Sequence, residues 1–324
     1  MRYLINDCTD PHWNMAFDQW CLEHLDTEEP VFYLWRNRPS VIVGLNQNAW
    51  AEVNLPYMQA HGITLARRVT GGGAVYHDLQ NLNYTIVGRT SDIERDYPGY
   101  TSLIAGAMGR LGLDVEISGR NDILTGGRKI SGYAKRVWRD RLMVHGTLMY
   151  DVDLETLTRV LDVPGSKMNS KGIASVRSRV ANIKDLMPGI AGVEDLQHRL
   201  TSVLSNGDAP LHLSPEALTQ IDELCSERFS RWEWNWGHSP KADLTRSGSL
   251  PCGTITAHIC IEQGMISAIS LTGDYIGSLP SKAVGDILQG CRYRREDILD
   301  RLSAIPVGMY FEKTTPAQIA EVVI

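Results

Sequence analysis

The residues best suited to chemistry lie in one stretch, residues 67–78, which reads RRVTGGGAVYHD. Three consecutive glycines are costly for folding, because none of them has a side chain to pack. They leave bare backbone N–H groups that can converge on an anion. Arg67 and Arg68 precede them and offer forked donors that suit phosphate or carboxylate. Short apolar runs flank the loop, so we interpret it as a site for an anionic ligand and not as a solvated surface turn.

A second basic stretch extends from residue 119 to residue 141. Its bases are Arg120, Arg128, Lys129, Lys135, Arg136, Arg139 and Arg141, and its acids are Asp122 and Asp140. In a chain that is acidic overall, this cluster indicates an anionic ligand or an acidic partner; the alternative is an edge strand protected by charge. Small neighbours such as Ser131 and Gly132 leave room for Lys129 to reach into a cleft. There its ammonium group would stabilise negative charge on a phosphate or an acyl oxyanion.

Other residues are weaker candidates for a catalytic or binding role. His145 could act as a base, although a lone histidine at a strand end is more often structural. Residues 166–184 are basic and form either a loop that closes over a phosphate-bearing ligand or a solvated loop. Asp78 and Asp122 are candidate magnesium ligands through water, and no cysteine–histidine cluster has zinc spacing. The whole set fits electrostatic catalysis at a phosphoryl or acyl-phosphate centre, without a Walker-type loop.

The composition fits a globular protein with two domains of unequal size. The 324 residues are 43% hydrophobic and 22% charged, and the net charge is −6, which argues against nucleic-acid binding. No apolar run is long enough to span a membrane, and the first residues lack the apolar core of a signal peptide. We therefore expect a cytoplasmic protein. Its six cysteines are expected to be free thiols, and none lies between Cys21 and Cys225.

The elements that must position the site follow an α+β order. Hydrophobic periodicity predicts helices over residues 14–25, 55–61, 100–111, 154–161, 193–204 and 215–229, the first capped by Asn14 and the last by Ser214. Strands are predicted at residues 31–35 and 40–45, joined as a hairpin, and at residues 63–67 and 81–87 on either side of the glycine loop. Turn residues predict a β-meander over residues 115–150. This order indicates a mixed or antiparallel sheet and not a doubly wound fold.

The residue pattern changes after Arg231, where an aromatic-rich segment begins. Three tryptophans alternate in residues 232–236, which favours a strand at a domain boundary. Beyond it we predict a small unit with a hairpin, residues 254–261 and 265–271, and three helices. Nothing in this unit is typical of catalysis. The predicted domains are residues 1–240 and residues 241–324.

Several motifs in the same order resemble the lipoate–protein ligase A family of the biotin/lipoate ligase superfamily. They are residues 67–78, GRND at 119–122, KISG at 129–132, HGTL at 145–148 and KGIASVRSRV at 171–180. The resemblance implies an α+β catalytic domain of the biotin/lipoate-ligase type and a small α+β carboxy-terminal domain. It implies an enzyme that uses ATP-Mg²⁺ to convert lipoate to lipoyl-AMP and then lipoylates a lysine of an acceptor domain. The acceptors would be E2 subunits of 2-oxoacid dehydrogenases or the glycine-cleavage H protein.

The same resemblance implies roles for single residues. Lys129 would be the catalytic residue and bridge the lipoyl carbonyl and the α-phosphate. The nucleotide would be held by Arg68, Gly73, Ala74, Val75, Tyr76, Lys129 and Asp122, with Asp122 also facing Mg²⁺. The substrate pocket would be formed by Trp35, Thr70, His77, Asn81, Lys129 and Thr147. Gln80 and Tyr133 depart from the family pattern, where glycine and a small residue are usual, and both would reshape the pocket wall.

An octanoyl or lipoyl transferase of the same fold is the nearest alternative. Such an enzyme needs a reactive cysteine that faces the lysine, and the motif region of this chain has no cysteine. A biotin ligase has a different glycine loop. A lipoyl-binding protein without catalysis would not need the intact lysine and loop.

Overall fold

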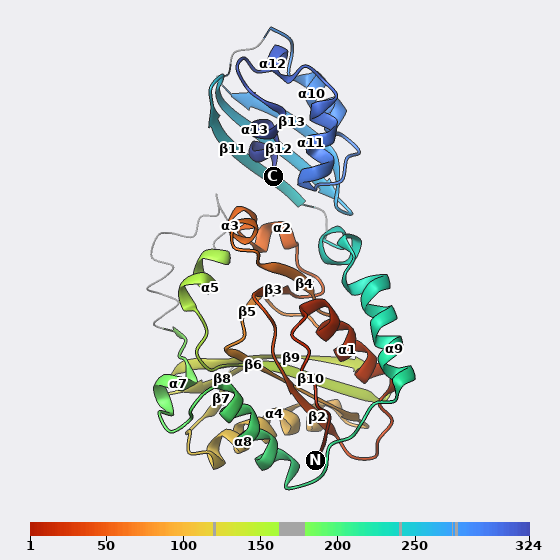
Figure 1. Ribbon diagram of the computed structural model, residues 1–324, viewed down its shortest axis with the longest axis vertical. Helices are drawn as coiled ribbons and strands as arrows, with labels where there is room; N and C mark the ends of the chain where they lie inside the picture. Colours follow the sequence, from red (N-terminus) through yellow and green to blue (C-terminus); the bar gives the residue numbers. More distant parts are fainter. Residues whose placement is uncertain (119–120, 162–178, 240–241, 274, 276–277) are drawn as a thin grey trace. The chain divides into compact units, whose positions relative to one another are not determined.

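The structure is a computed structural model that describes residues 1–118, 121–161, 179–239, 242–273, 275 and 278–324 (Figure 1). Their contacts divide them into two compact units. The first unit holds the described residues of 1–47, 52–161 and 179–231, and the second holds those of 48–51 and 232–324. The short segment at residues 48–51 therefore packs with the second unit, although the chain on both sides of it belongs to the first.

A mixed seven-stranded sheet is the framework of the first unit, in the order β1–β2–β6–β10–β9–β8–β7. Its strands are β1 (Arg2–Tyr3), β2 (Val31–Trp35), β6 (Asn81–Arg89), β7 (Glu116–Ser118), β8 (Asp122–Thr125), β9 (Arg128–Trp138) and β10 (Arg141–Met149). The predicted meander is confirmed, since β7 to β10 are neighbours in chain order. Its turns use the left-handed backbone region at Gly126, Gly127 and Arg139, with φ of 52°, 74° and 53°.

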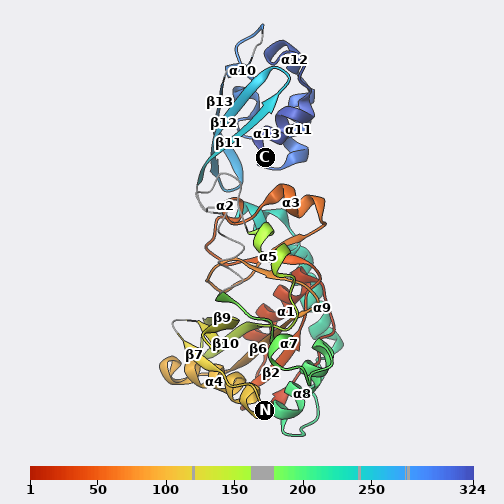
Figure 2. The ribbon, with the colours of Figure 1, turned by 90° about the vertical axis from the view of Figure 1, so that its left-hand side faces the viewer.

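Strand alternation gives this sheet two different faces. Leu82, Tyr84 and Ile86 of β6 lie in the main hydrophobic core. Helices α4 (Ile93–Arg110) and α8 (Val193–Ser205) cover that face (Figures 1 and 2). Asn83 and Thr85 alternate with the core residues and therefore point to the opposite face. The same alternation separates the core-facing and opposite-facing residues of β2 and β10.

The opposite face of the large sheet packs against α1 (Pro11–His24), which in turn packs against α9 (Pro215–Leu224). A three-stranded sheet, β4 (Thr64–Arg67)–β3 (Ser40–Val43)–β5 (Val75–His77), also lies on this side (Figure 1). β3 pairs with β4 in parallel and with β5 antiparallel. Shorter helical segments complete the unit: α3 (Leu55–Ala60), α5 (Leu154–Val160), α7 (Ile183–Leu186) and a π-helical turn (Cys225–Phe229). The predicted α+β class with a mixed sheet is confirmed.

Two predictions about the amino-terminal elements are wrong. The first helix begins at Pro11, because Asp10 caps it by accepting the backbone N–H groups of His12 and Trp13. Asn14 lies inside the helix and is buried, with its amide bonded to carbonyl groups outside it. β2 and β3 do not form a hairpin, since they belong to different sheets. β2 pairs instead with β6, where all five of its buried residues contribute to the large sheet.

The second unit is a three-stranded antiparallel sheet with helices. Its elements are α2 (Ala49–Glu52) at the shared segment, β11 (Ala242–Leu250), β12 (Gly253–Glu262), β13 (Met265–Gly273), α10 (Lys282–Leu288), α11 (Arg295–Ser303), α12 (Val307–Tyr310) and α13 (Pro316–Val323). The predicted hairpin is confirmed as β12–β13. The predicted tryptophan strand is wrong, because Glu233–Gly237 forms a π-helical turn. Its Trp236 packs on Trp50 with ring centroids 4.2 Å apart, and Tyr293 contacts Trp50 at 4.6 Å.

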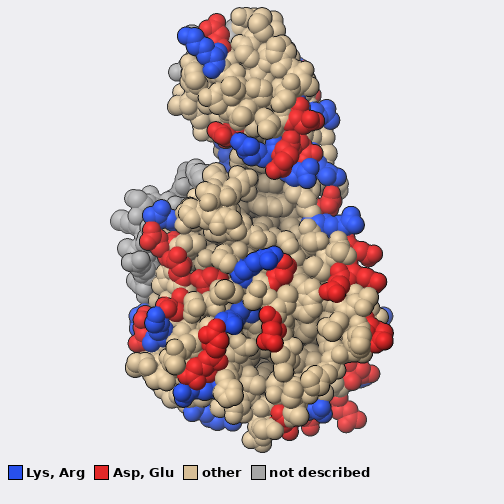
Figure 3. Space-filling view, viewed as in Figure 1, with Lys and Arg blue, Asp and Glu red and all other residues tan. Residues whose placement is uncertain are grey.

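The surface carries charges of both signs. Acidic and basic side chains are interspersed over the face of the molecule seen in Figure 3. Among the described residues, no helix is both long and apolar enough to cross a membrane.

Candidate active site

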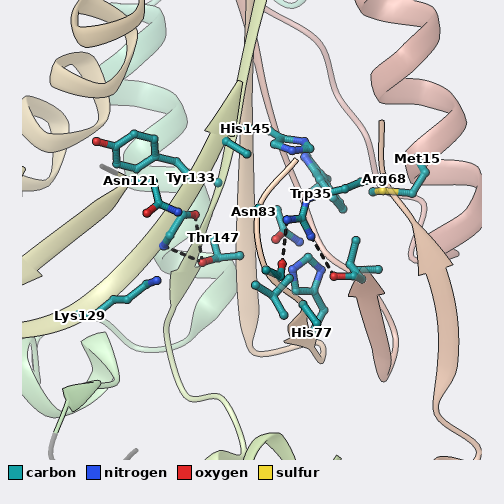
Figure 4. A pocket seen from close by; sticks show the side chains of 18 residues that line it. Met15, Trp35, Arg68, His77, Asn83, Asn121, Lys129, Tyr133, His145 and Thr147 are labelled. Carbon is teal, nitrogen blue, oxygen red and sulfur yellow. Dashed lines mark hydrogen bonds between the residues drawn. The ribbon is translucent and has the colours of Figure 1, made fainter. Parts of the chain in front are cut away.

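A cavity of about 150 Å³ lies in the first unit, between the large sheet and the three-stranded sheet. It is lined by Met15, Trp35, Ile42, Arg68, Gly72, Gly73, Ala74, Val75, His77, Asn83, Asn121, Lys129, Gly132, Tyr133, Ala134, His145, Gly146 and Thr147 (Figure 4). Strand alternation explains why distant residues meet here. Trp35, Asn83 and Thr147 lie on β2, β6 and β10, and all three face away from the main core.

The cavity has an exposed end and a buried end. Gly72, Gly73 and Asn121 are exposed, and the side chain of Lys129 is 35% exposed. Met15 and Ile42 are 1% exposed and Trp35 is 3% exposed. A ligand that spans the cavity would therefore meet backbone amides and an ammonium group at one end. At the other it would meet the apolar side chains of Met15, Trp35 and Ile42 beside the buried polar side chains of His77 and Asn83.

The glycine loop is built for close approach of backbone. Gly72 has a φ of 97°, which favours glycine. A Cβ on Gly44 would lie 2.2 Å from the carbonyl oxygen of Gly72, so these two segments can be this close only without a side chain. Arg68 holds the loop by donating to the carbonyl oxygens of Gly71 and Gly73, each at 2.8 Å. These bonds keep the exposed glycines in one conformation next to the cavity.

The two arginines of the motif do different things. Arg67 is fully buried and donates to the carbonyl oxygens of Gly44, Leu45 and Gln47 at 2.7 to 3.1 Å. Burial lowers the pKa of its guanidinium to about 10, which leaves it charged at neutral pH. Arg67 therefore supports the backbone at residues 44–47, whereas Arg68 lines the cavity.

Lys129 reaches the cavity because of an irregularity in β9. Ile123 pairs with Ser131 and Leu124 pairs with Lys129, so Ile130 is an extra residue on β9. Such a bulge turns neighbouring side chains, and it brings Lys129 and Gly132 to the same side of the strand. The Nζ atom of Lys129 lies 2.7 Å from Oδ1 of Asp122. A Cβ on Gly132 would lie only 3.0 Å from that Nζ, so glycine leaves the space that the lysine occupies.

A buried hydrogen-bond chain connects α1 to the glycine loop. The carboxylate of Asp18 is 2.6 Å from Nδ1 of His145, whose Nε2 is 2.7 Å from Oγ1 of Thr70. Thr70 in turn accepts a bond from Nε of Arg68 at 3.0 Å. All these side chains are less than 10% exposed. The loop conformation is thus tied to a carboxylate on α1.

The structure brings most of the predicted site residues together. Trp35, Arg68, Gly73, Ala74, Val75, His77, Lys129 and Thr147 all line the cavity. Three others contact lining residues: Thr70 through Arg68 and His145, Asp122 through Lys129, and Asn81 by donating to Oδ1 of Asn83 at 2.9 Å. Tyr76 is buried in β5 and is not a lining residue; burial raises the pKa of its hydroxyl.

Sequence reasoning missed several lining residues. Met15, Ile42, Asn83 and Asn121 were given no role, and His145 was considered more often structural. The period of two along β6 could have indicated Asn83, because Asn81 and Asn83 share a face. Nothing local pairs Met15 with Ile42, which lie on different elements.

The two departures from the family pattern have different positions. Tyr133 lines the cavity and packs edge-on against Tyr97 of α4, with centroids 5.9 Å apart. Gln80 is not among the lining residues; its carbonyl oxygen accepts the N–H groups of Tyr150 and Asp151. Tyr133 is therefore part of the cavity wall, and Gln80 is not. The basic stretch at residues 166–178 and Arg120 lie outside the described residues.

Asp78 is occupied by backbone contacts. Its two carboxylate oxygens accept the N–H groups of Gln80 at 2.8 Å and Asp153 at 3.1 Å. Among the described residues, no group of three histidine, cysteine or acidic side chains is arranged to hold a metal ion. Asp122, beside Lys129, is the carboxylate that remains next to the cavity. One carboxylate suits Mg²⁺ that arrives on phosphates and keeps water ligands.

Comparison with known proteins gives consistent similarities. The family profile of the lipoyl protein ligase A/B catalytic domain matches residues 10–205, and that of the bacterial lipoate protein ligase C-terminus matches residues 239–323. Lipoate-protein ligase LplJ of Bacillus subtilis (strain 168) is 36% identical over 320 residues, 97% of each chain. Among solved structures, a bi-partite lipoate protein ligase from Thermoplasma acidophilum is 30% identical with a TM-score of 0.68, covering 74% of this chain and 98% of that chain. A lipoate-protein ligase A bound with ATP is 29% identical with a TM-score of 0.65, covering 73% and 98%.

Proposed function

Because the chain belongs to the lipoate–protein ligase family, we propose that the cavity of its first unit is where lipoate reacts with ATP. The protein is a lipoate–protein ligase with the fold of that family. In the first step, a carboxylate oxygen of lipoate bonds to the α-phosphorus of ATP, and the bond to pyrophosphate breaks. In the second step, a lysine amine of an acceptor bonds to the acyl carbon, AMP leaves, and the amine loses a proton.

The polarity of the cavity orients the acyl substrate. The apolar chain of lipoate fits the buried end, between Met15, Trp35 and Ile42. Its carboxylate then lies toward the exposed end, where Lys129 supplies a positive charge. This gradient from apolar to cationic is the observation that carries the proposal, because it matches a long acyl chain with one anionic end.

The nucleotide is proposed to lie on the glycine loop. Residues 71–73 are exposed and carry no side chains, so their N–H groups are open to phosphate oxygens. The backbone of Ala74 and Val75 would continue this surface into β5, with Tyr76 behind it as structural support. Arg68 would add positive charge while it holds the loop carbonyl groups.

Lys129 is proposed to act in both steps. Attack of the carboxylate on phosphorus, and later of the amine on the mixed anhydride, each build negative charge between the acyl carbonyl and the α-phosphate. One ammonium at that point stabilises both transition states. Thr147, whose hydroxyl accepts the N–H of Gly132 at 3.2 Å, fixes the strand next to it. Asp122 would orient the lysine and would help to hold the Mg²⁺ ion bound to ATP. The positive charge of that ion would reduce the repulsion between the phosphate and the attacking carboxylate.

The partners proposed for the second step are lipoyl-acceptor domains, such as those of E2 subunits or the glycine-cleavage H protein. The Thermoplasma neighbour was solved as a lipoylation system that includes its E2 lipoyl domain. We assign the second unit an accessory role, in line with the predicted domain of residues 241–324, since the lining residues all come from the first unit. Its proposed role is to cover the site and to change position between the two half-reactions.

The cysteines argue against a transferase that works through a thioester. None of the described residues that line the cavity is a cysteine. Burial raises the pKa of the Cys21 thiol well above its usual value and that of Cys225 to about 11. Protonated thiols are poor nucleophiles, so the acyl group has no carrier of this kind beside Lys129.

The test of this function uses the full chain, an acceptor domain and the two small substrates. Pyrophosphate exchange into ATP should require lipoate, and mass spectrometry should show one lipoyl group on the acceptor only when ATP-Mg²⁺ and lipoate are both present. A variant with all six cysteines replaced should retain transfer as long as it folds. Transfer that needed no ATP, or that a single Cys→Ala change abolished in a folded protein, would support the transferase instead.

A further inference from the structure

Two residues that line the cavity each have one polar side-chain atom that is buried without a hydrogen-bond partner among the described residues. These atoms are Nε2 of His77 and Nδ2 of Asn83. The two residues are 3% and 1% exposed. Leaving a buried hydrogen-bond donor without an acceptor costs free energy. An unpaired donor on a residue that lines a binding cavity therefore indicates that the bound ligand supplies the acceptor. The proton position on His77 decides whether its Nε2 is a donor.

A chain of side-chain amides sets that proton. Nδ2 of Asn14 lies 2.9 Å from the carbonyl oxygen of Cys8 and 3.1 Å from that of Arg36. Carbonyl oxygens accept only, so these contacts fix which end of the Asn14 amide is nitrogen. The same nitrogen is 2.8 Å from Asn37, whose facing atom is therefore its oxygen Oδ1. The nitrogen of Asn37 then faces Nδ1 of His77 at 3.1 Å.

The consequence for His77 is a single tautomer. Its Nδ1 accepts from Asn37, so the proton of the neutral ring is on Nε2. Burial, together with the nearby Arg68 and His145, lowers the pKa of His77 to about 3, which excludes a second proton near neutral pH. The one N–H group of the His77 side chain is therefore at Nε2, on a residue that lines the cavity (Figure 4).

The position of this donor indicates which part of a substrate it meets. His77 and Asn83 are buried like Met15 and Trp35, whereas Lys129 stands at the exposed end. If the carboxylate reacts beside Lys129, the far end of the acyl chain lies near the buried donors. Lipoate ends there in a disulfide ring, whose sulfur atoms are weak hydrogen-bond acceptors, and octanoate ends in a methyl group.

We propose that Asn14 and Asn37 are positioning residues that keep the proton of His77 on Nε2, and that this N–H group makes the enzyme prefer lipoate to octanoate. The inference rests on the proposed function and adds a selectivity to it. A site with buried donors disfavours an analogue that lacks the acceptor, because the donors then stay unpaired. Asn83 adds a second donor to the same wall.

The experiment compares pyrophosphate exchange with lipoate and with octanoate in three full-length proteins. In His77→Phe the donor is lost while a somewhat larger aromatic ring stays in its place, and the lipoate-to-octanoate ratio of kcat/KM should fall by roughly tenfold. In His77→Gln an amide N–H replaces the ring donor, and the ratio should stay within about threefold of the wild type. An unchanged ratio in His77→Phe overturns the selectivity, while exchange with both acids leaves the proposed function standing. Exchange with neither acid in the wild type contradicts the function itself.

The amide chain has its own readout. The ¹⁵N shifts of His77 in the wild-type protein should show a protonated Nε2 and a bare Nδ1 between pH 6 and pH 8, a range near the usual histidine pKa. Asn37→Ser removes the donor to Nδ1 and should give a mixture of tautomers with an intermediate substrate ratio. A protonated Nδ1 in the wild type overturns the role of Asn14 and Asn37, whether or not the variant folds.

Discussion

At the scale of single residues, the site separates catalysis from support. Lys129 carries the charge that we assign to both chemical steps, and Asp122 holds it at 2.7 Å. Arg67 contacts backbone carbonyl groups and is buried, so it maintains the wall without meeting a ligand. Arg67 and Arg68 are adjacent arginines with different roles, because β4 ends at Arg67 and the two side chains point in different directions.

Replacement of Lys129 should impair both half-reactions. Lys129→Ala removes one preorganised donor, and such a loss typically costs roughly 3–4 kcal/mol, or about two to three orders of magnitude in rate. Lys129→Arg should rescue little, since a planar guanidinium places its charge differently. The measurements are pyrophosphate exchange for the first step and transfer from preformed lipoyl-AMP for the second. A wild-type rate of transfer from lipoyl-AMP in Lys129→Ala would limit the lysine to the first step.

The buried neutral His77 should make the fold sensitive to acid. Its pKa is about 3 in the folded protein against 6.5 ordinarily, so the unfolded chain binds a proton that the folded one refuses. Stability is therefore full above pH 6.5 and falls as the pH drops from 6.5 toward 3, by about 1.4 kcal/mol per unit. Between pH 7.5 and pH 5, His77→Gln should lose about 2 kcal/mol less than the wild type in urea unfolding. Equal losses in the two proteins would mean that His77 is charged in the folded state.

At the scale of elements, β9 decides where Lys129 points, the residue to which we assign catalysis. The bulge at Ile130 places Lys129 and Gly132 side by side, three positions apart in a strand whose period is two. A regular strand would direct one of them into the core formed with α4. The small residues after the bulge then keep the cavity open around the ammonium group.

Gly132→Ala tests this arrangement. The new Cβ would lie 3.0 Å from Nζ and 3.1 Å from Cε of Lys129, and the lysine tip is flexible enough to move away. We expect a folded protein whose kcat is reduced by roughly 10- to 100-fold, because a shift of about 1 Å at a catalytic group has effects of that size.

A matched control is available in α4. Gly106 is exposed in the helix interior, and a Cβ there would meet no atom within 4 Å. Gly106→Ala should leave activity unchanged and raise the free energy of unfolding by about 0.5–1 kcal/mol. If Gly132→Ala retained full activity, Lys129 would have more freedom than the structure indicates.

At the scale of the whole molecule, the chain forms two units, and the cavity belongs to the first of them. The described lining residues belong to the first unit, and the second unit packs around Trp50 with Trp236 and Tyr293. The Thermoplasma neighbour covers 74% of this chain.

Truncation after residue 240 tests the division of labour. The shortened chain retains Trp236 against Trp50 and loses Tyr293. It should transfer the lipoyl group from supplied lipoyl-AMP, while activation of free lipoate should fall by at least about tenfold, because the proposed cover over the site is lost. Circular dichroism before and after heating checks that the fragment is folded. Full activation by a folded fragment would leave the second unit without the covering role.

Local signals in the sequence determined much of this protein. Turn residues at Gly126, Gly127 and Arg139 specify the meander, and Ser214 caps its helix as its side chain predicts. The glycine loop and Lys129 were also recognisable, because their chemistry depends on residue type and on short spacing. Motif order along the chain was enough to indicate the family, and the comparisons confirm it.

The tertiary structure decided what depends on contacts far apart in the chain. β2 pairs with β6 and not with its sequence neighbour β3, and all five residues of β2 are buried in that arrangement. Asp18 meets His145 across 127 positions, and Asn14 becomes an interior amide because carbonyl groups from two other segments surround it. Hydrogen-bond partners of this kind are set by packing, which sums many weak contacts over distant segments. Local residue patterns do not contain information about contacts between distant segments. The caps and turns could therefore be predicted from the sequence, whereas the buried hydrogen-bond network could not.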